Sequence, residues 1–332
     1  MADNLRAGIV GLGMMGRHHA RVLGQLPGVD LVAAADPSGD IYGAAGDVPI
    51  GDSVQFVLDA KPDYVVVAAP TGFHREMALR IAEAGVHVMV EKPLAPSVAE
   101  ATEIAAAFGD AGLIGAVGHI ERFNPALQAL RERLEARELG DVYQVVTRRQ
   151  GPFPARIADV GVILDLATHD IDLTAWATGS NYASVAAQTA IKSGRPHEDL
   201  VAWVGRLENG TVTSHLVNWL SPMKERVTIV TGEAGAFVAD TLTADLTFYA
   251  NGTHVTQWDQ LAGFRGVSEG DVIRYALNKY EPLRLEHEAM RDAVLGTGTG
   301  IVTLSEGLAT VIVAEALIES ARSGAAVSLA LD

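Results

Sequence analysis

Residues 6–17, RAGIVGLGMMGR, constrain the fold of this chain more than any other segment. A short apolar run leads into a G-x-G-x-x-G pattern, and a helix-like run over residues 17–26 follows it. In this context the first glycine permits a tight turn, the second lets a pyrophosphate approach the backbone, and the third lets the helix lie against the sheet. The free N–H groups of the first helical turn favour an anion. We therefore predict a dinucleotide site formed by Gly11, Gly13, Met14, Met15 and Gly16.

The identity of the dinucleotide is indicated by Asp36, which follows a second apolar run at residues 31–35. It lies about twenty residues after the glycine pattern, where such folds place the acid that accepts hydrogen bonds from the adenosine ribose. A 2′-phosphate would require arginine or lysine there, and residues 37–40 contain neither. We therefore predict NAD as the cofactor rather than NADP. The alternative is that Asp36 only caps a turn.

The first part of the chain alternates apolar runs with helix-like segments. Further apolar runs lie at 64–69, 86–90 and 113–117, with helix-like segments at 73–84 and 98–108. Continuous Val/Ile/Ala runs alternating with helices predict an α/β fold, a doubly wound parallel sheet of the Rossmann type with both faces covered. Ligands of such sheets bind outside the carboxyl ends of the strands. The residues at these predicted ends are Gly11, Asp36, Pro70, Lys92 and His119.

The pattern changes after residue 121, so we predict a Rossmann domain at 1–121 and a second domain at 122–332. The second domain contains alternating apolar and polar segments, which predict a large, mostly antiparallel sheet in an α+β domain. These segments are 142–149, 184–191, 200–207, 211–220, 225–231, 236–240 and 246–249, with helices at 124–137, 160–178, 286–295 and 305–322.

One layer of helices would leave the other face of this sheet open. We therefore predict a homodimer or homotetramer packed through the sheet, with Trp203, Trp219, Phe237 and Phe248 as its aromatic residues. The alternative for each aromatic residue is an ordinary core position facing the domain's own helices.

Composition excludes several classes of partner and site. The formal net charge is −16, which opposes binding to nucleic acids or anionic membranes, because both require clustered Lys and Arg. Cysteine is absent, so there is no disulfide or thiolate ligand. We see no signal peptide and no apolar run long enough to span a membrane, so we expect a soluble, cytoplasmic protein. Asp165, His169 and Asp170 are conceivable metal ligands, but no HExxH pattern accompanies them, and we expect no metal.

Three residues are candidates for proton transfer. Asp165 and His169 are four residues apart, which would place both on one face of the helix predicted at 160–178. Lys92 follows a buried strand and precedes Pro93, and a cationic nicotinamide beside it would disfavour the ammonium form. Taken alone, the first two could be a surface pair, and the third a solvated loop lysine.

Together these motifs resemble the Gfo/Idh/MocA oxidoreductase family. The resemblance rests on GLGMMG, the Asp36 of AADP, Glu91-Lys92-Pro93, and the Asp165 and His169 of LDLATHDID, in the same order. It covers essentially the whole chain. Within the family, GHIERFNPA and EPLRLEHEA are most similar to UDP-N-acetylglucosamine 3-dehydrogenases and related nucleotide-sugar 3-dehydrogenases.

The resemblance implies an NAD-dependent dehydrogenase acting on a secondary alcohol of a sugar or cyclitol. It implies that Lys92, Asp165 and His169 form the catalytic set. The cofactor would be lined, beyond the glycine loop and Asp36, by Pro70, Thr71, His74, Glu91 and Lys92. The substrate would contact Lys92, Arg122, Asn124, Arg156, Asp165 and His169, with Arg148 and Arg149 as further phosphate candidates. Two alternatives remain: a dehydrogenase for inositol or another sugar, and a non-catalytic regulatory protein that responds to NAD.

Overall fold

The computed structural model describes residues 4–153, 160–252 and 270–330. The chain divides into two compact units. One contains Met1–Phe123 and Tyr280–Glu315, and the other contains Asn124–Lys279 and Ala316–Asp332. Each unit is built around its own sheet.

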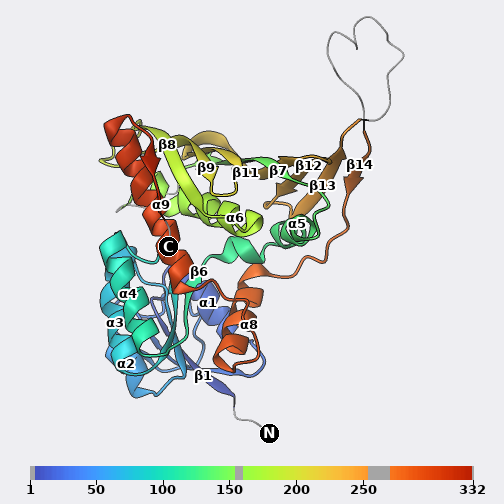
Figure 1. The fold of residues 1–332 in the computed structure, drawn as a ribbon. Helices are drawn as coiled ribbons and strands as arrows, with labels where there is room; N and C mark the ends of the chain where they lie inside the picture. The colour runs from blue at the N-terminus through green and yellow to red at the C-terminus, as the bar shows by residue number, and fades with distance from the viewer. Residues whose placement is uncertain (1–3, 154–159, 253–269, 331–332) are drawn as a thin grey trace, which may run out of the picture. The chain divides into compact units, whose positions relative to one another are not determined.

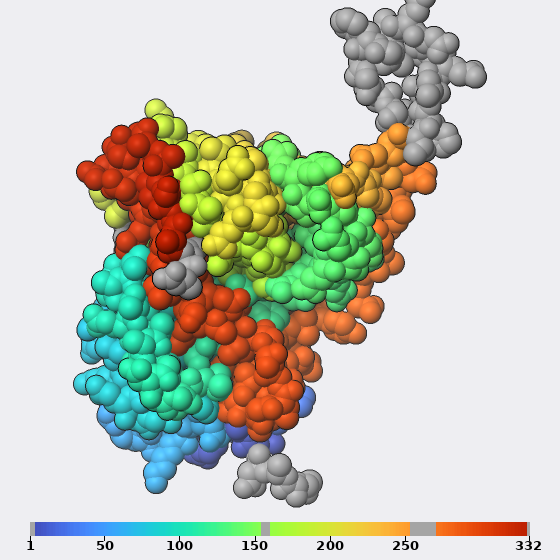
Figure 2. All heavy atoms as spheres, viewed as in Figure 1, coloured from blue at the N-terminus to red at the C-terminus, as the bar shows by residue number. Residues whose placement is uncertain are grey.

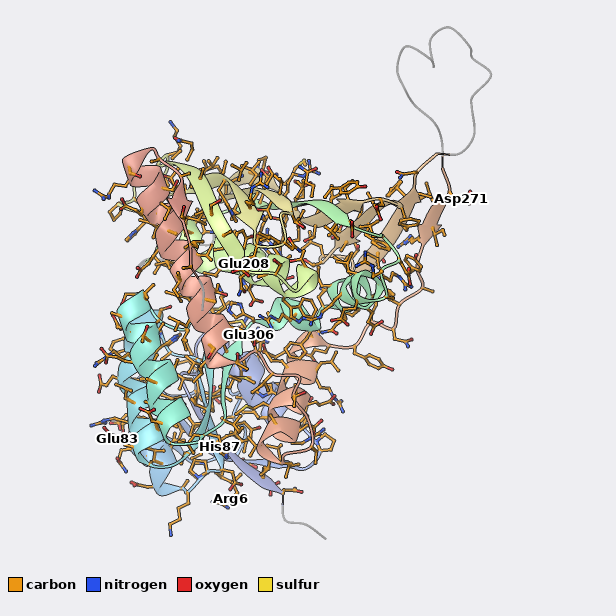
Figure 3. All side chains as sticks on the ribbon, in the orientation of Figure 1. Arg6, Glu83, His87, Glu208, Asp271 and Glu306 are labelled. Carbon is orange, nitrogen blue, oxygen red and sulfur yellow. The ribbon has the colours of Figure 1, made fainter. Side chains whose placement is uncertain are left out.

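The first unit contains the predicted Rossmann sheet, in the order β3-β2-β1-β4-β5-β6, with parallel pairing throughout the described residues. Its strands are β1 (Leu5–Val10), β2 (Val29–Ala35), β3 (Ile50–Gly51), β4 (Tyr64–Val67), β5 (His87–Glu91) and β6 (Gly115–Gly118). Figure 3 shows Arg6 and His87 at one edge of this sheet, the amino-terminal edge. The predicted doubly wound fold is confirmed, and the loops after β1, β2, β4 and β5 meet at the opposite edge.

Helices cover both faces of this sheet, and alternate residues of each strand enter separate cores (Figure 1). In β4, Val65 and Val67 pack on one side, and Tyr64 and Val66 pack on the other. Burial on both faces explains why these strands are apolar without alternation. The unit's helical elements are α1 (Gly16–Leu23), α2 (Val54–Asp59), η1 (Thr71–Phe73), α3 (His74–Glu83), α4 (Val98–Asp110), η2 (Ile120–Phe123), α8 (Pro282–Val294) and the first part of α9 (Leu304–Ser323).

The helical tail expected in the second domain returns in part to the Rossmann unit. Met290 of α8 lies in the same core as Ala7 and Ile9 of β1. Leu304 and Val311 of α9 belong to the core on the other face. Figure 2 shows the orange atoms of α8 packed against the blue and cyan atoms of the same unit. Apolar burial therefore ties residues 280–315 to the first unit.

The second unit contains a nine-stranded sheet in its described residues, ordered β14-β13-β12-β11-β7-β10-β9-β8-β15. Neighbouring strands are antiparallel except β7 and β10, which confirms the mostly antiparallel prediction. The strands are β7 (Val142–Pro152), β8 (Tyr182–Ala190), β9 (Leu200–Leu207), β10 (Val212–Asn218), β11 (Leu220–Gly232), β12 (Gly235–Asp240), β13 (Asp245–Ala250), β14 (Val272–Arg274) and β15 (Val327–Ser328). Its helices are α5 (Pro125–Glu135), the π-helical turn η3 (Ile163–Ala167) and α6 (Thr168–Thr178).

The assignment of the four aromatic residues to the open face of this sheet is wrong. Trp203, Trp219 and Phe237 are buried within the single chain, and Phe248 packs on the same core as α5. Phe237 belongs to the core that includes Leu127 and Leu130 of α5, so it faces the unit's own helices. The exposed side chains of this sheet include Val204 and Tyr249.

Within the three described stretches of chain, no helix combines the length and the apolar character that crossing a bilayer requires.

Candidate functional site

The glycine loop joins β1 to α1 and has the backbone geometry that the sequence predicts. Gly11 has φ +90°, and a Cβ atom there would lie 2.6 Å from the Ala68 backbone. A Cβ atom on Gly16 would lie 1.9 Å from the carbonyl oxygen of Gly11, so only glycine lets α1 start this close to the strand. A Cβ atom on Gly13 would meet nothing within 4 Å. The loop is therefore tight toward the sheet and open on its outer side.

The start of α1 is suited to an anion. Met15 occupies the N-cap position and makes no side-chain hydrogen bond to the helix, and the first turn contains no acidic residue. The positive end of the helix dipole is thus not neutralised by the helix's own side chains. Met14 is exposed and Met15 is half-buried beside it. A pyrophosphate fits the chemistry of this loop.

Asp36 is fixed across the end of β2. One carboxylate oxygen accepts a hydrogen bond from the Leu12 N–H at 2.8 Å, and the other accepts one from the Ser38 N–H at 2.8 Å. Each carboxylate oxygen has a second acceptor position. The carboxylate is therefore held beside the glycine loop and can still accept hydrogen bonds from ribose hydroxyls. Asp36 can therefore cap the turn through these two N–H groups and also accept hydrogen bonds from a ribose.

Glu91 and Lys92 lie where β5 ends, at the same edge of the sheet. Glu91 is buried, and its Oε2 accepts a hydrogen bond from the Lys92 N–H at 3.1 Å. Burial alone would raise the pKa of Glu91, but the hydrogen bond from His19, together with the Lys92 charge and N–H, holds the pKa below its ordinary value. The Lys92 side chain is half-buried. The ionised Glu91 therefore anchors the backbone of the lysine.

The segment after β4 contains the other predicted cofactor residues. Pro70 is exposed and Thr71 is half-buried, so both are accessible at this edge. His74 is buried, and its ring nitrogens lie 2.9 Å from the Ala69 carbonyl oxygen and 3.0 Å from the Pro93 carbonyl oxygen. Burial lowers the pKa of His74, against the opposing effect of these carbonyls. His74 connects the ends of β4 and β5, so its contacts are with the backbone of the protein.

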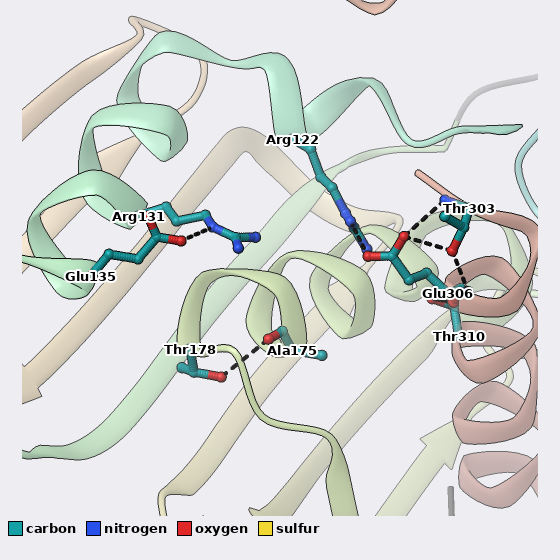
Figure 4. Close-up of polar contacts among 8 residues, drawn as sticks. All are labelled: Arg122, Arg131, Glu135, Ala175, Thr178, Thr303, Glu306 and Thr310. Carbon is teal, nitrogen blue, oxygen red and sulfur yellow. Dashed lines mark hydrogen bonds and ion pairs between the residues drawn. The ribbon is translucent and has the colours of Figure 1, made fainter. Parts of the chain in front are cut away.

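Two predicted substrate residues already have structural partners. The Arg122 guanidinium donates to Glu306 Oε1 at 2.6 Å, and Glu306 also accepts hydrogen bonds from Thr303 (Figure 4). Asn124 caps α5 by accepting from the Ala126 N–H, and its amide donates to the Thr241 carbonyl. These contacts explain both residues without a bound sugar, and their substrate roles remain predictions.

Asp165 and His169 lie at the start of the helix that ends at Thr178, but the predicted regular helix from 160 is wrong. Residues Ile163–Ala167 form a π-helical turn, and the α-helix begins at Thr168. The wider turn changes the relative direction of the two side chains from that of a regular α-helix. Asp165 is buried and His169 is half-buried. π-Turns of this kind are frequent at functional sites.

Two acidic residues, Glu198 and Asp170, fix the position of this segment through contacts that the sequence did not predict. Glu198 Oε1 accepts a hydrogen bond from the Ile163 N–H at 3.0 Å, and a Cβ atom on Gly161 would lie 2.0 Å from the same carboxylate. On the sheet side, Arg149 donates to Asp170 at 2.9 Å, and both side chains are buried. Arg149 is thus engaged by the residue next to His169. Neither partner could be inferred from sequence spacing.

Arg156, the remaining predicted substrate residue, lies outside the described residues. Among the residues that the structure does describe, no group of three His, Cys, Asp or Glu side chains could hold a metal ion.

Comparison with known proteins identifies the family. Residues 5–119 match the profile of the Gfo/Idh/MocA oxidoreductase family, described as an NAD-binding Rossmann fold. Residues 127–238 match the profile of the Gfo/Idh/MocA C-terminal domain. The chain belongs to the Gfo/Idh/MocA oxidoreductase family. The resemblance inferred from the motifs is thereby confirmed, as is the NAD-binding character of the first unit.

Relatives of this Gfo/Idh/MocA member carry the names of two kinds of dehydrogenase. The chain is 33% identical over 217 residues to UDP-N-acetylglucosamine 3-dehydrogenase of Acidithiobacillus ferrooxidans, a match covering 64% of this chain and 66% of the relative. It is 32% identical over 195 residues to scyllo-inositol 2-dehydrogenase (NAD(+)) of Bacillus subtilis, covering 56% of this chain and 57% of the relative. Both matches span less than two thirds of the relative's length.

The fold is shared over nearly the whole chain. The solved structure of UDP-N-acetylglucosamine 3-dehydrogenase GnnA from Acidithiobacillus ferrooxidans superposes with a TM-score of 0.84 at 24% sequence identity. The superposition covers 97% of this chain and 99% of that one. This likeness concerns the fold.

Proposed function

We propose that this Gfo/Idh/MocA member is an NAD-dependent dehydrogenase that oxidises a secondary alcohol of a sugar. The observation that carries the proposal is the Asp36 carboxylate, held on the glycine loop by the Leu12 and Ser38 N–H groups. Family membership supports the same reaction class, since the two relatives named above are both dehydrogenases of polyhydroxylated substrates.

The residues of the first unit fit the cofactor. The open outer side of Gly13 and the uncapped start of α1 suit a pyrophosphate, and Asp36 suits the adenosine ribose. Pro70, Thr71, Glu91 and Lys92 lie at the same edge of the sheet and would line the nicotinamide half. When bound there, NAD supplies an acceptor for the hydride that leaves the substrate carbon.

Oxidation also requires a group that removes the hydroxyl proton. We assign this role to His169, because an imidazole exchanges protons near neutral pH and its side chain is partly accessible. Asp165, buried four positions earlier, would orient the imidazole ring. Lys92 would form a hydrogen bond with the reacting oxygen and help to relay the proton that leaves it.

Two substrate classes compete. The first candidate is the C3 hydroxyl of a UDP-N-acetyl amino sugar, supported by the relative with 33% identity and by the motifs GHIERFNPA and EPLRLEHEA. The second is an inositol or another sugar, supported by the relative with 32% identity. A purely regulatory NAD-binding protein is disfavoured, because it would not need Lys92, Asp165 and His169 together.

The test is NADH formation by the purified protein with UDP-sugars, free sugars and inositols, each with NAD and with NADP. We expect the highest rate with NAD and a UDP-N-acetyl amino sugar. A faster reaction with an inositol would select the second candidate. Saturable NAD binding without turnover of any of these alcohols would contradict the enzymatic proposal.

Replacing Asp36 with alanine should weaken NAD binding and relax the preference against NADP. The variant loses an ionised acceptor for the ribose, and such charged hydrogen bonds contribute about 1.5–3 kcal/mol, or roughly a tenfold to hundredfold rise in Kd. Removing the negative charge also removes its repulsion of a 2′-phosphate. Calorimetric titration with both dinucleotides checks this, with Asp30→Ala as the control because Asp30 is an exposed carboxylate of β2, the strand that Asp36 follows. An unchanged Kd for NAD would remove Asp36 from the site.

The oligomeric state remains a prediction. We propose that the open face of the second sheet, which exposes Val204, Val212 and Tyr249, packs against another copy of the chain. Sedimentation equilibrium should show a dimer or tetramer, and Val204→Lys should shift it toward the monomer.

A further inference from the structure

Three buried side chains behind the carboxyl edge of the Rossmann sheet form a continuous hydrogen-bonded chain. Glu91 Oε1 lies 2.7 Å from His19 Nε2, and His19 Nδ1 lies 2.8 Å from His287 Nε2. The three come from β5, α1 and α8, which are far apart in the sequence. His19 and His287 have no exposed surface, and Glu91 is 7% exposed. No step of the proposed reaction uses either histidine.

The direction of the hydrogen bonds follows from the chemistry of the groups. An ionised carboxylate only accepts, so His19 must donate to Glu91 from Nε2. In neutral His19 the other ring nitrogen is then an acceptor, and His287 must donate to it from Nε2. Burial lowers the pKa of His287 well below its ordinary value, which keeps this ring neutral as well. His287 therefore donates a hydrogen bond to His19, and His19 donates one to Glu91.

At its Glu91 end, this chain of hydrogen bonds contacts the backbone of Lys92, the residue proposed for catalysis. Glu91 uses Oε1 for His19 and Oε2 for the Lys92 N–H, so both ends of the carboxylate are fixed. Gly118 of the neighbouring strand leaves room for this carboxylate, because a Cβ atom there would lie 3.0 Å from Glu91 Oε1. The position of the His19 ring thus determines where the carboxylate lies, and the carboxylate holds the backbone of Lys92.

His287 carries a buried atom that packing alone does not explain. Its Nδ1 has no hydrogen-bond partner among the described residues, although the ring is fully buried. A leucine would fill a similar volume without burying a polar nitrogen. Burying this nitrogen costs free energy that a leucine would not cost. The group that histidine supplies and leucine lacks is the Nε2–H donor.

We propose that His287 and His19 are positioning residues for Lys92, acting through Glu91. The proposal rests on the proposed function, because it assigns the benefit to the reaction in which Lys92 takes part. Loss of these hydrogen bonds should lower kcat and leave the KM for NAD nearly unchanged, because the glycine loop and Asp36 take no part in them.

The experiment compares His287→Leu with His287→Gln and with His18→Leu. Leucine removes the donor to His19, whereas the glutamine amide can place an N–H group near the same position. His18 is the exposed neighbour of His19 on α1 and serves as the matched control. We expect kcat to fall about tenfold in His287→Leu, since small displacements of a catalytic group have effects of this order or larger. We expect kcat within about threefold of the unaltered protein in His287→Gln, and no change in His18→Leu.

Nitrogen NMR of the imidazole rings gives a second measurement that needs no substrate. His287 should remain neutral with its proton on Nε2 between about pH 6 and pH 8. The exposed His18 serves as a titrating reference, although partial burial and the charges of Arg17 and Arg21 lower its pKa from the ordinary value. A His287 ring that gains a proton in this pH range would contradict the proposed hydrogen bonds from His287 to His19 and Glu91. Unaltered kcat in folded His287→Leu would overturn the positioning role alone, and absence of turnover in the unaltered protein would instead contradict the proposed function.

Discussion

Replacing His169 with asparagine should lower kcat by about a hundredfold to ten-thousandfold, the usual contribution of a general acid–base group. Asparagine has a similar size and retains one hydrogen-bond donor, but it cannot accept the hydroxyl proton near neutral pH. NAD binding should be preserved, because the glycine loop and Asp36 belong to the other compact unit. Stopped-flow measurement of NADH formation with saturating NAD and sugar checks the prediction.

The control for this variant is its own dinucleotide affinity, measured by quenching of protein fluorescence. A loss of kcat with unchanged NAD affinity supports the role of His169 as the base. If His169→Asn retains full activity, the mechanism is wrong and the base lies elsewhere. Asp165→Asn should show a smaller loss than His169→Asn, since Asp165 is assigned an effect on the imidazole rather than on the substrate.

The second large effect is expected from Arg149→Met, which breaks the buried ion pair with Asp170. Methionine preserves most of the side-chain length but leaves the Asp170 carboxylate without its guanidinium partner. Removing one member of a buried pair commonly costs about 3–5 kcal/mol, because the remaining charge is still desolvated. Asp170 adjoins His169, so we also expect lower activity at temperatures where the variant is folded. Thermal and urea unfolding, followed by circular dichroism, measure the change.

Arg148→Met is the matched control for this variant. Arg148 is the preceding residue of β7, and its guanidinium pairs with Glu225 at the surface with 48% of its side chain exposed. Exposed pairs contribute about 0–1 kcal/mol, so little change is expected. The double variant Arg149→Met/Asp170→Asn should be more stable than Arg149→Met, because no uncompensated charge remains. Equal stability of Arg148→Met and Arg149→Met would contradict the structural role of the buried pair.

The Rossmann unit could be predicted because its signals are local. The continuous apolar run at Tyr64–Val67 reflects burial on both faces of β4, and the glycine loop has few alternative structures. Gly16, for example, is restricted by an atom only five residues away, the Gly11 carbonyl oxygen. The second sheet was likewise visible from alternation, although alternation does not reveal which face a helix will cover. Trp203 and Phe237 were therefore assigned to the wrong face.

The remaining features depend on contacts between distant parts of the chain. The return of Met290 to the core of β1 leaves no local pattern, so α8 could not be assigned to the first unit from the sequence. Likewise, Asn124 and His74 meet backbone carbonyls whose positions follow only from the complete fold. The π-helical turn at Asp165 has no characteristic residue composition by which it could be recognised in the sequence. The cofactor-site residues therefore stay a prediction from the motifs, while the contacts that support them could be found only in the structure.

The reaction that we propose is the transfer of a hydride from a sugar carbon to NAD. Its most direct test uses the sugar alcohol that reacts best in the substrate panel, labelled with deuterium at the carbon that bears the reacting hydroxyl. Mass spectrometry of the products after reaction with NAD should find the deuterium in the reduced nicotinamide and a keto group on the sugar. Reduced nicotinamide without deuterium, or label retained on the sugar or lost to water, would contradict the account.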